Sequence, residues 1–196
     1  MTRIAYTTDG EYSIYQLADE DRYNYTELHR QTNGDTTLFL NDTVKDLMWD
    51  SAVNHQKNKS FSIYDFNGEY CGNIEIQNYQ SNTPEIGIDL LENMRNQGIA
   101  VKTVKMLTKQ FCKEHNVDYF LIRIMENNPH SIHVFEKMGA MPIGKEENIV
   151  DSIIDEINHE TDKNYSDQVQ EIIKNAFKDD DGVKVLRYKL LPTIND

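Results

Sequence analysis

The stretch from Met94 to Leu107, MRNQGIAVKTVKML, begins as a polar loop and continues as an apolar helical pattern. Gly98 and the small residue Ala100 stand where the helix should start. Backbone N–H groups at the start of a helix have no partner within it, and the helix dipole is positive there. Such an end binds phosphate groups, and residues without bulky side chains let a phosphate approach closely. The stretch predicts a diphosphate site, although Gly98 taken alone is more typical of a plain turn.

A second stretch, NPHSIHVFEKMGA, spans residues 128–140 and carries the signals of a complete helix. Asn128 suits the N-cap, Pro129 the first helical position and Gly139 the residue just past the end. Ser131 and Phe135 lie one turn apart on the same face. We therefore predict a helix here that presents Ser131 and Phe135 on one side.

Two histidines of this helix, His130 and His133, are three residues apart and raise the question of a metal. No third ligand is evident in the sequence, and we predict no metal site. The two cysteines, Cys71 and Cys112, form no CxxC pair, and Cys112 lies in an apolar run. We expect both to be buried free thiols rather than a disulfide.

The rest of the sequence predicts a chain of mixed α/β class. Asn67-Gly68 between two alternating runs is a strong hairpin signal. The segment EIGIDLL (residues 85–91) alternates like a strand, and VDYFLIRIM (residues 117–125) is a nearly continuous apolar strand. The remaining expected elements are a strand within residues 11–21, helices over 20–31 and 42–56, a helix after Gly98, and a last strand within 183–192.

Between about 146 and 181 the sequence has a different texture. Two acidic segments carry isoleucines and valines on one face, as amphipathic helices do. The last strand must rejoin the sheet after them. We predict a single domain over residues 1–196, with an acidic two-helix insertion at about 146–181 before the last strand.

Composition limits the partners. The 196 residues include 33 acidic and 20 basic side chains, for a net charge of -13. We expect neither nucleic acid nor an anionic membrane as a partner, because both need a basic surface. The N-terminus lacks an apolar signal core and no apolar run approaches membrane-spanning length. We predict a cytoplasmic protein, either a monomer or a homodimer.

The two chemical motifs together resemble those of the GNAT superfamily of N-acetyltransferases. Arg95–Ala100 resembles the R/Q-x-x-G-x-G/A motif, which lies between a strand and a helix in that family. Residues 128–140 resemble its N-x-x-S/A-x-x-x-Y-x-x-x-G-F segment. The sequences of that segment and of EIGIDLL are similar to those of one branch of the family, the ribosomal-protein alanine N-acetyltransferases.

The resemblance implies a twisted mixed central sheet with helices on both faces, and acetyl-coenzyme A (acetyl-CoA) as co-substrate. It implies that strand 85–91 splays from strand 117–125, so that the pantetheine arm fits between them. The backbone at Ile88, Asp89 and Leu90 would pair with the pantetheine amides, and the N–H groups of Asn96 to Val101 would hold the diphosphate. The full expected set is Ile88, Asp89, Leu90, Arg95, Asn96, Gln97, Gly98, Ile99, Ala100, Val101, Asn128 and Phe135.

Acetyl transfer to an amine needs a neutral nitrogen, so a base or a water chain must remove a proton. Glu85 is the candidate base, with Glu75 and Glu126 as rivals, although a solvated strand-edge acid is the plainer reading of Glu85. The family often protonates the leaving thiolate with a tyrosine where this chain has Phe135, which cannot donate. The resemblance assigns that contact to Ser131, which could equally be an ordinary first-turn residue.

We therefore predict an acetyl-CoA-dependent N-acetyltransferase. It would transfer acetyl to a primary amine of a small molecule or of a protein N-terminus by direct attack on the thioester. The alternative is a catalytically weak acyl-CoA-binding module of the same fold, with the acidic helices as a partner-binding surface. Phe135 keeps that alternative open.

Overall fold

The computed structural model describes residues 3–32, 40, 42–146 and 183–192. Within them, eight strands form one mixed sheet in the order β1-β2-β3-β4-β5-β6-β8-β7. The strands are β1 (Thr7–Thr8), β2 (Tyr12–Gln16), β3 (Lys59–Asp65), β4 (Tyr70–Gln77), β5 (Glu85–Leu90), β6 (Phe120–Met125), β7 (Met141–Glu146) and β8 (Val185–Leu190). The helices are α1 (Arg22–Thr32), α2 (Asp42–Asn54), α3 (Ile99–Glu114) and α4 (Pro129–Lys137). This confirms the predicted α/β class with a mixed sheet.

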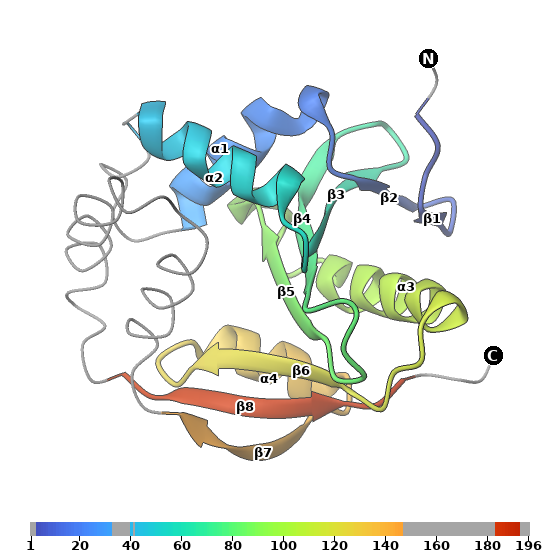
Figure 1. Cartoon of the computed structure of the whole chain (residues 1–196), viewed down its shortest axis with the longest axis vertical. Coiled ribbons are helices and arrows are strands. Elements are labelled where there is room, and N and C mark those ends of the chain that lie inside the picture. Colours follow the sequence, from blue (N-terminus) through green and yellow to red (C-terminus); the bar gives the residue numbers. More distant parts are fainter. Residues whose placement is uncertain (1–2, 33–39, 41, 147–182, 193–196) are drawn as a thin grey trace.

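The helices cover both faces of the sheet (Figure 1). α1 and α2 lie on one side of β3, β4 and β5, and α3 lies on the other side. α4 packs beside the strands at the far end of the sheet, where the Tyr188 hydroxyl donates to Glu136 Oε1 at 3.3 Å. The predicted layers are therefore present.

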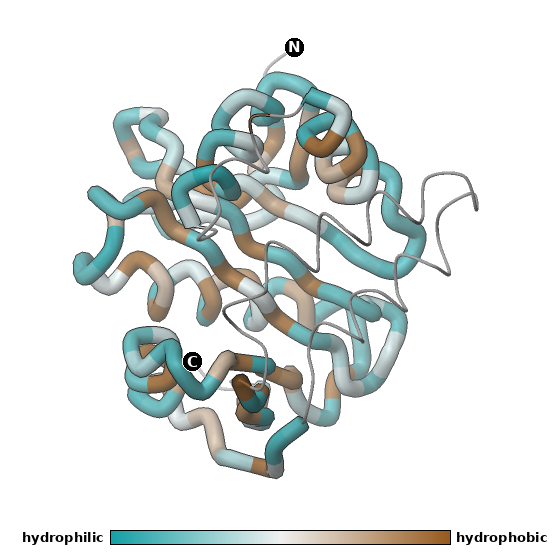
Figure 2. The backbone as a smooth tube through the Cα atoms, turned by 90° about the vertical axis from the view of Figure 1, so that its left-hand side faces the viewer, coloured by the Kyte–Doolittle hydropathy of each residue, from teal (hydrophilic) through white to brown (hydrophobic). Residues whose placement is uncertain are grey.

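The core follows from the alternation along the strands, which Figure 2 shows as changing hydropathy along the tube. Ile74, Ile76 and Ile86 point to the α3 side and are fully or almost fully buried. Val104, Leu107 and Phe111 of α3 are fully buried against them, as their helical spacing predicts. The opposite face of β3 to β5 is more polar and faces α1 and α2.

The hairpin between β3 and β4 forms where Asn67-Gly68 predicts it. Gly68 has a φ of +78°, a left-handed conformation that glycine adopts without steric cost. Its N–H donates to Asp65 O at 3.0 Å, and Asp65 N–H donates to Glu69 O at 3.0 Å. The turn brings β3 and β4 into antiparallel register next to β5.

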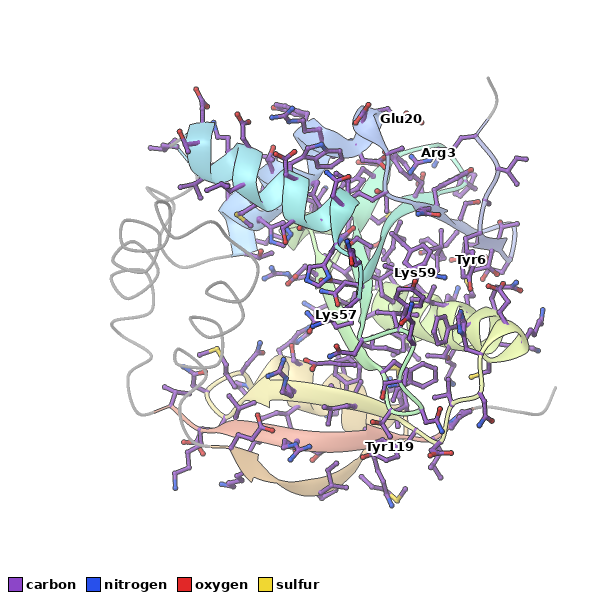
Figure 3. All side chains as sticks on the ribbon, viewed as in Figure 1. Arg3, Tyr6, Glu20, Lys57, Lys59 and Tyr119 are labelled. Carbon is purple, nitrogen blue, oxygen red and sulfur yellow. The ribbon has the colours of Figure 1, made fainter. Side chains whose placement is uncertain are left out.

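Two side chains near the N-terminus fasten that segment to the rest of the sheet (Figure 3). Arg3 Nη1 donates to Asp21 Oδ1 at 2.8 Å, and the Tyr64 hydroxyl donates to the same oxygen at 2.7 Å. Asp21 has no exposed surface. The Tyr6 hydroxyl donates to Glu114 Oε2 of α3 at 3.1 Å.

The last strand lies inside the sheet rather than at its edge. β8 pairs antiparallel with β6 on one side and with β7 on the other. The predicted return of the chain to the sheet is confirmed. The predicted helical insertion falls on residues outside the described part of the chain. Among the described residues, no helix is long and apolar enough to cross a membrane.

Candidate active site

β5 and β6 diverge. They run parallel, and their only paired residues are Glu85 and Leu121, at the start of both strands. Beyond this bridge, β5 stays paired with β4 through Leu90, while β6 stays paired with β8. The two strands therefore open into a V, as Figure 1 shows. The splay implied by the family resemblance is present.

After the bridge, one backbone edge of β5 therefore has no strand beside it within the described part of the chain. Ile88 and Leu90 are half-buried there, with their side chains toward the α3 side. A β-strand edge presents a row of N–H and C=O groups that another extended chain can pair with. The geometry fits the amide-bearing arm of coenzyme A, which would lie in the V as an additional strand.

A short loop leads from β5 to α3 and contains two residues in left-handed conformation. Asn96 has a φ of +61° and Gly98 a φ of +79°. Left-handed residues alternating with others turn successive N–H groups toward one side, which is the arrangement that binds anions. A Cβ at Gly98 would meet no atom within 4 Å, so the space in front of it is open.

α3 begins immediately after this loop, at Ile99. Gly98 O accepts a helical hydrogen bond from Lys102 N–H at 3.1 Å. The N–H groups of Ile99, Ala100 and Val101 come before it, and the first turn of a helix leaves such groups without a partner inside the helix. The helix dipole is positive at the same point. The loop and the helix start therefore fit a diphosphate.

Arg95 ties the loop to the end of β5. Its backbone is extended and its Nε donates to Leu90 O at 3.1 Å. The adjacent Gln97 side chain donates to Asn93 O at 2.7 Å. Both side chains thus stabilise the loop itself, a role that the motif alone does not reveal.

Gly72 of β4 allows β5 to come close, and it was not among the residues predicted from the sequence. A Cβ on Gly72 would lie 2.1 Å from the carbonyl oxygen of Asp89. The register between β3 and β4 shifts at Ile63/Tyr64, opposite this point. A glycine inside a strand pattern is a known signal of a bulge or a close backbone approach, so YCGNIEI carried the information.

The Asn-capped helix is present as predicted. Asn128 Oδ1 accepts from Ser131 N–H at 3.1 Å, and Pro129 occupies the first turn. Ser131 is half-buried, and its hydroxyl makes no hydrogen bond to any described residue. Phe135 is only 5% exposed and belongs to the core. Asn128 is therefore confirmed as an N-cap, while the roles of Asn128, Ser131 and Phe135 toward a cofactor stay predictions.

Glu85 lies at the closed end of the V and is held by Arg123 of β6. Arg123 Nε is 2.9 Å from Glu85 Oε1 and 2.8 Å from Oε2, and the Glu85 side chain is 13% exposed. This pair was not predicted from the sequence, because residues of β6 come next to β5 only in the folded sheet. The pair gives Glu85 a structural role beside the catalytic role predicted for it.

The two rival acids lie in different places. Glu126 Oε1 accepts from Lys184 N–H at 3.2 Å, and its Oε2 is 3.5 Å from Lys145 Nζ. Glu75 is half-buried on the face of β4 that looks toward α1, where its charge acts on Tyr25. Glu75 thus belongs to β4, whereas Glu126 follows the end of β6.

Both cysteines are free, Cys71 buried and Cys112 half-buried. Burial, followed by the nearby Asp65 carboxylate, raises the pKa of Cys71 to about 11, so it is a poor nucleophile at neutral pH. Among residues 3–32, 40, 42–146 and 183–192, no group of three or more His, Cys, Asp or Glu could hold a metal ion.

Known structures resemble this fold. Spermidine N-acetyltransferase from Vibrio cholerae in complex with CoA and spermine superimposes with a TM-score of 0.65 at 13% identity, over 94% of this chain and 98% of that one. Spermidine/spermine N-acetyltransferase SpeG from Vibrio cholerae in complex with manganese ions gives a TM-score of 0.62 at 14% identity, over 93% and 94%. At such identity the likeness shows the fold alone.

Comparison with curated protein sequences gives no match. The predicted branch of ribosomal-protein alanine N-acetyltransferases is not supported, because the family model that matches describes an acetyltransferase (GNAT) domain and names no branch. The family model of the acetyltransferase (GNAT) domain matches residues 7–141, more than half of the chain. The chain is therefore an acetyltransferase of the GNAT family.

Proposed function

We propose that this protein is an acetyl-CoA-dependent N-acetyltransferase whose acceptor is the primary amine of a small molecule or of a peptide N-terminus. The observation that carries the proposal is the V between β5 and β6, joined only at Glu85 and Leu121 and leading into the loop before α3. An open strand edge followed by a helix start suits a cofactor with both amides and phosphates.

In this proposal, the backbone of Ile88, Asp89 and Leu90 pairs with the pantetheine amides. The N–H groups from Asn96 to Val101 bind the diphosphate, and Arg95 keeps the loop in place through Leu90 O. The bound co-substrate supplies an activated acetyl group as a thioester. Asn128 lies at the start of α4, after the end of β6, on the other arm of the V.

The reaction itself asks little of the chain. The lone pair of the neutral amine attacks the thioester carbonyl carbon, and a new C–N bond forms. The C–S bond breaks, coenzyme A leaves as a thiolate, and the amine proton passes to a base. Placing both reactants together supplies much of the acceleration. A backbone N–H on the free edge of β5 would donate to the carbonyl oxygen as it gains negative charge.

Two side chains are proposed for the proton transfers. Glu85 would accept the amine proton through water. It lies at the start of β5, whereas the cofactor loop follows the end of β5. A pantetheine arm that runs from the loop along β5 would therefore extend its thioester toward Glu85. Ser131 would protonate the thiolate, since its half-buried hydroxyl has no hydrogen bond to a described residue. Phe135 cannot take this part, and its side chain is in the core.

The second candidate is a cofactor-binding module with little turnover. It is favoured by Phe135, where the family often has a tyrosine that protonates the thiolate. An ordinary thiolate is nevertheless a tolerable leaving group near neutral pH. Transfer without a dedicated acid therefore remains chemically reasonable.

A transfer assay separates the two candidates. The protein is incubated with acetyl-CoA and with a panel of aliphatic diamines, amino alcohols, monoamines and short peptides, and mass spectrometry follows the amines. Spermine belongs in the panel, because a protein of the same fold is known in complex with it. An enzyme gives amine-dependent release of coenzyme A and an acetylated amine. Coenzyme A binding without any acetylated product would leave only the binding module.

A further inference from the structure

The face of β4 and β5 that looks toward α1 is built differently from the opposite, apolar face. In the antiparallel ladder Asn73 lies opposite Asp89, and Glu75 lies opposite Gly87. Residues directly opposite each other in such a ladder point to the same side of the sheet. This face therefore gathers two carboxylates, an amide and a glycine beside the V.

Gly87 lies in the middle of β5, where the geometry of the strand does not require a glycine. Its φ is not in the left-handed range, it is exposed, and an added Cβ would meet no atom within 4 Å. A glycine inside a strand weakens it, because it costs entropy and offers no side chain to pack. The described residues thus give no packing reason for the glycine, whereas a ligand that passes close to the β5 backbone would give one.

Asp89 follows two residues later on the same face and is exposed. Its carboxylate acts electrostatically on Tyr25 and His29 of α1 and on Tyr70 of β4, so it lies on the side of the sheet that faces α1. Among the described residues it forms no ion pair and no hydrogen bond. It is therefore an anion in position to bind a cation from outside the chain.

Two buried polar atoms near Asp89 also have no partner in the part of the chain that is described. They are the Tyr70 hydroxyl and Asn73 Oδ1, and each of these residues is only 6% exposed. Buried polar groups in proteins nearly always have a hydrogen-bond partner. Both atoms accept hydrogen bonds, as a protonated amine requires.

We infer that this face is the acceptor channel, that Gly87 leaves room for the acceptor over β5, and that Asp89 selects acceptors with a second positive charge. The inference rests on the proposed function and names its substrate class, an aliphatic diamine or polyamine. The reacting nitrogen must give up its proton to the proposed base Glu85, so a second carboxylate paired with it would oppose the reaction by stabilising its protonated form. Asp89 therefore serves the nitrogen that stays protonated, with Tyr70 and Asn73 as further acceptors.

The test compares two acceptors of equal length, butane-1,4-diamine and 4-aminobutan-1-ol. The amino alcohol keeps the reacting amine and replaces the second ammonium by a hydroxyl. In the native chain we expect kcat/KM for the diamine to exceed that for the amino alcohol by about tenfold, the size of a charge-assisted hydrogen bond at a partly exposed site. Asp89→Asn keeps the shape and removes the charge, and should bring this ratio close to one. Asp118→Asn removes an exposed charge in the loop before β6 and serves as control for net charge.

Gly87 is tested by a pair of measurements. Gly87→Ala should leave the urea midpoint unchanged or higher, because alanine suits a strand better than glycine. It should nevertheless raise KM for the diamine several-fold, and Gly87→Val should raise it further. A glycine with only a structural role would show the reverse, a lower midpoint with unchanged KM.

The outcomes separate the inference from the function. Absence of acetylation of every amine overturns the proposed function and this inference with it. Acetylation without preference for the diamine, or a preference that survives Asp89→Asn, overturns the inference and leaves the N-acetyltransferase in place. A Gly87→Val variant that folds and keeps the native KM overturns the assignment of the channel to this face.

Discussion

Gly72 and Asp89 approach each other so closely that a single Cβ on Gly72 would lie 2.1 Å from the Asp89 carbonyl oxygen. The same Cβ would lie 2.9 Å from Leu90 Cα. Backbone atoms cannot yield as the end of a flexible side chain does. The β5 segment that is proposed to pair with the cofactor can thus take its position only because residue 72 of the neighbouring strand is a glycine.

Gly72→Ala should therefore displace the end of β5. We expect it to lower the free energy of unfolding by roughly 3 kcal/mol, the upper range for overpacking, and to weaken coenzyme A binding. Urea unfolding and calorimetry measure the two effects. Gly10→Asn is the matched control, because a Cβ at Gly10 meets nothing and asparagine tolerates its φ of +88°. Unchanged coenzyme A affinity in Gly72→Ala would show that the end of β5 does not contact the cofactor.

Substitution of Asn128 should affect stability, whereas substitution of Ser131 should affect turnover. Asn128→Ala removes the side-chain oxygen that accepts from Ser131 N–H, and should cost about 1 kcal/mol of stability. Ser131→Ala keeps that N–H and removes the hydroxyl, so kcat should fall by at least about tenfold if the serine protonates the thiolate. The dissociation constant of coenzyme A should change little. Ser51→Ala, on the exposed side of α2, is the control. Full turnover in Ser131→Ala would remove Ser131 from the mechanism.

The pair of Glu85 and Arg123 predicts a shared stability effect. Glu85→Gln and Arg123→Met each break a half-buried ion pair that joins β5 to β6 at the point of the V. Each should lower the free energy of unfolding by about 1–3 kcal/mol. If Glu85 also accepts the amine proton, only Glu85→Gln will remove the acidic limb of the pH–rate profile. Equal losses of kcat in both variants, with that limb retained, would reduce Glu85 to its structural role.

Asp21 predicts the acid sensitivity of the fold. Burial alone would raise its pKa, but hydrogen bonds from Arg3, Tyr64 and Ala18 N–H outweigh burial and hold the pKa below its ordinary value. A carboxyl with a lowered folded pKa contributes stability above its unfolded pKa and loses that contribution as the pH falls through the folded pKa. Asp21→Asn should cost about 3 kcal/mol near neutral pH. The difference from the native chain should shrink below about pH 4. A difference that is constant from neutral to acid pH would contradict the role of the ionised carboxylate.

Much of the fold was predictable because its signals are local. The Asn67-Gly68 turn, the caps of α4 and the spacing of Val104, Leu107 and Phe111 in α3 each fix an element from a few neighbouring residues. The cofactor loop was predictable for the same reason, since Gly98 and the following apolar run belong to one continuous stretch. Its left-handed φ at Gly98 is the conformation that such a glycine permits.

The features that the sequence analysis missed are long-range. Arg123 meets Glu85 only because β6 lies parallel to β5 in the folded sheet, and Asp21 meets Arg3 and Tyr64 from three separate segments. The place of β8 between β6 and β7 likewise depends on pairing between strands that are far apart in the sequence, and its own alternation does not reveal it. A nearly continuous apolar run such as residues 117–125 is typical of a strand covered on both faces. The structure shows that β6 buries one face fully and the other by half.

Calorimetric titration of coenzyme A into two variants of Gly98 tests the central claim most directly, namely that the cofactor diphosphate lies at the loop before α3. Gly98→Asn and Gly98→Asp have nearly the same shape, and both residues tolerate the left-handed φ of +79°. They differ in one negative charge, placed in the open space in front of the loop. We predict that Gly98→Asn keeps measurable affinity and that Gly98→Asp binds at least about tenfold more weakly, with the gap narrowing at high salt. Equal affinities in two folded variants would contradict the account.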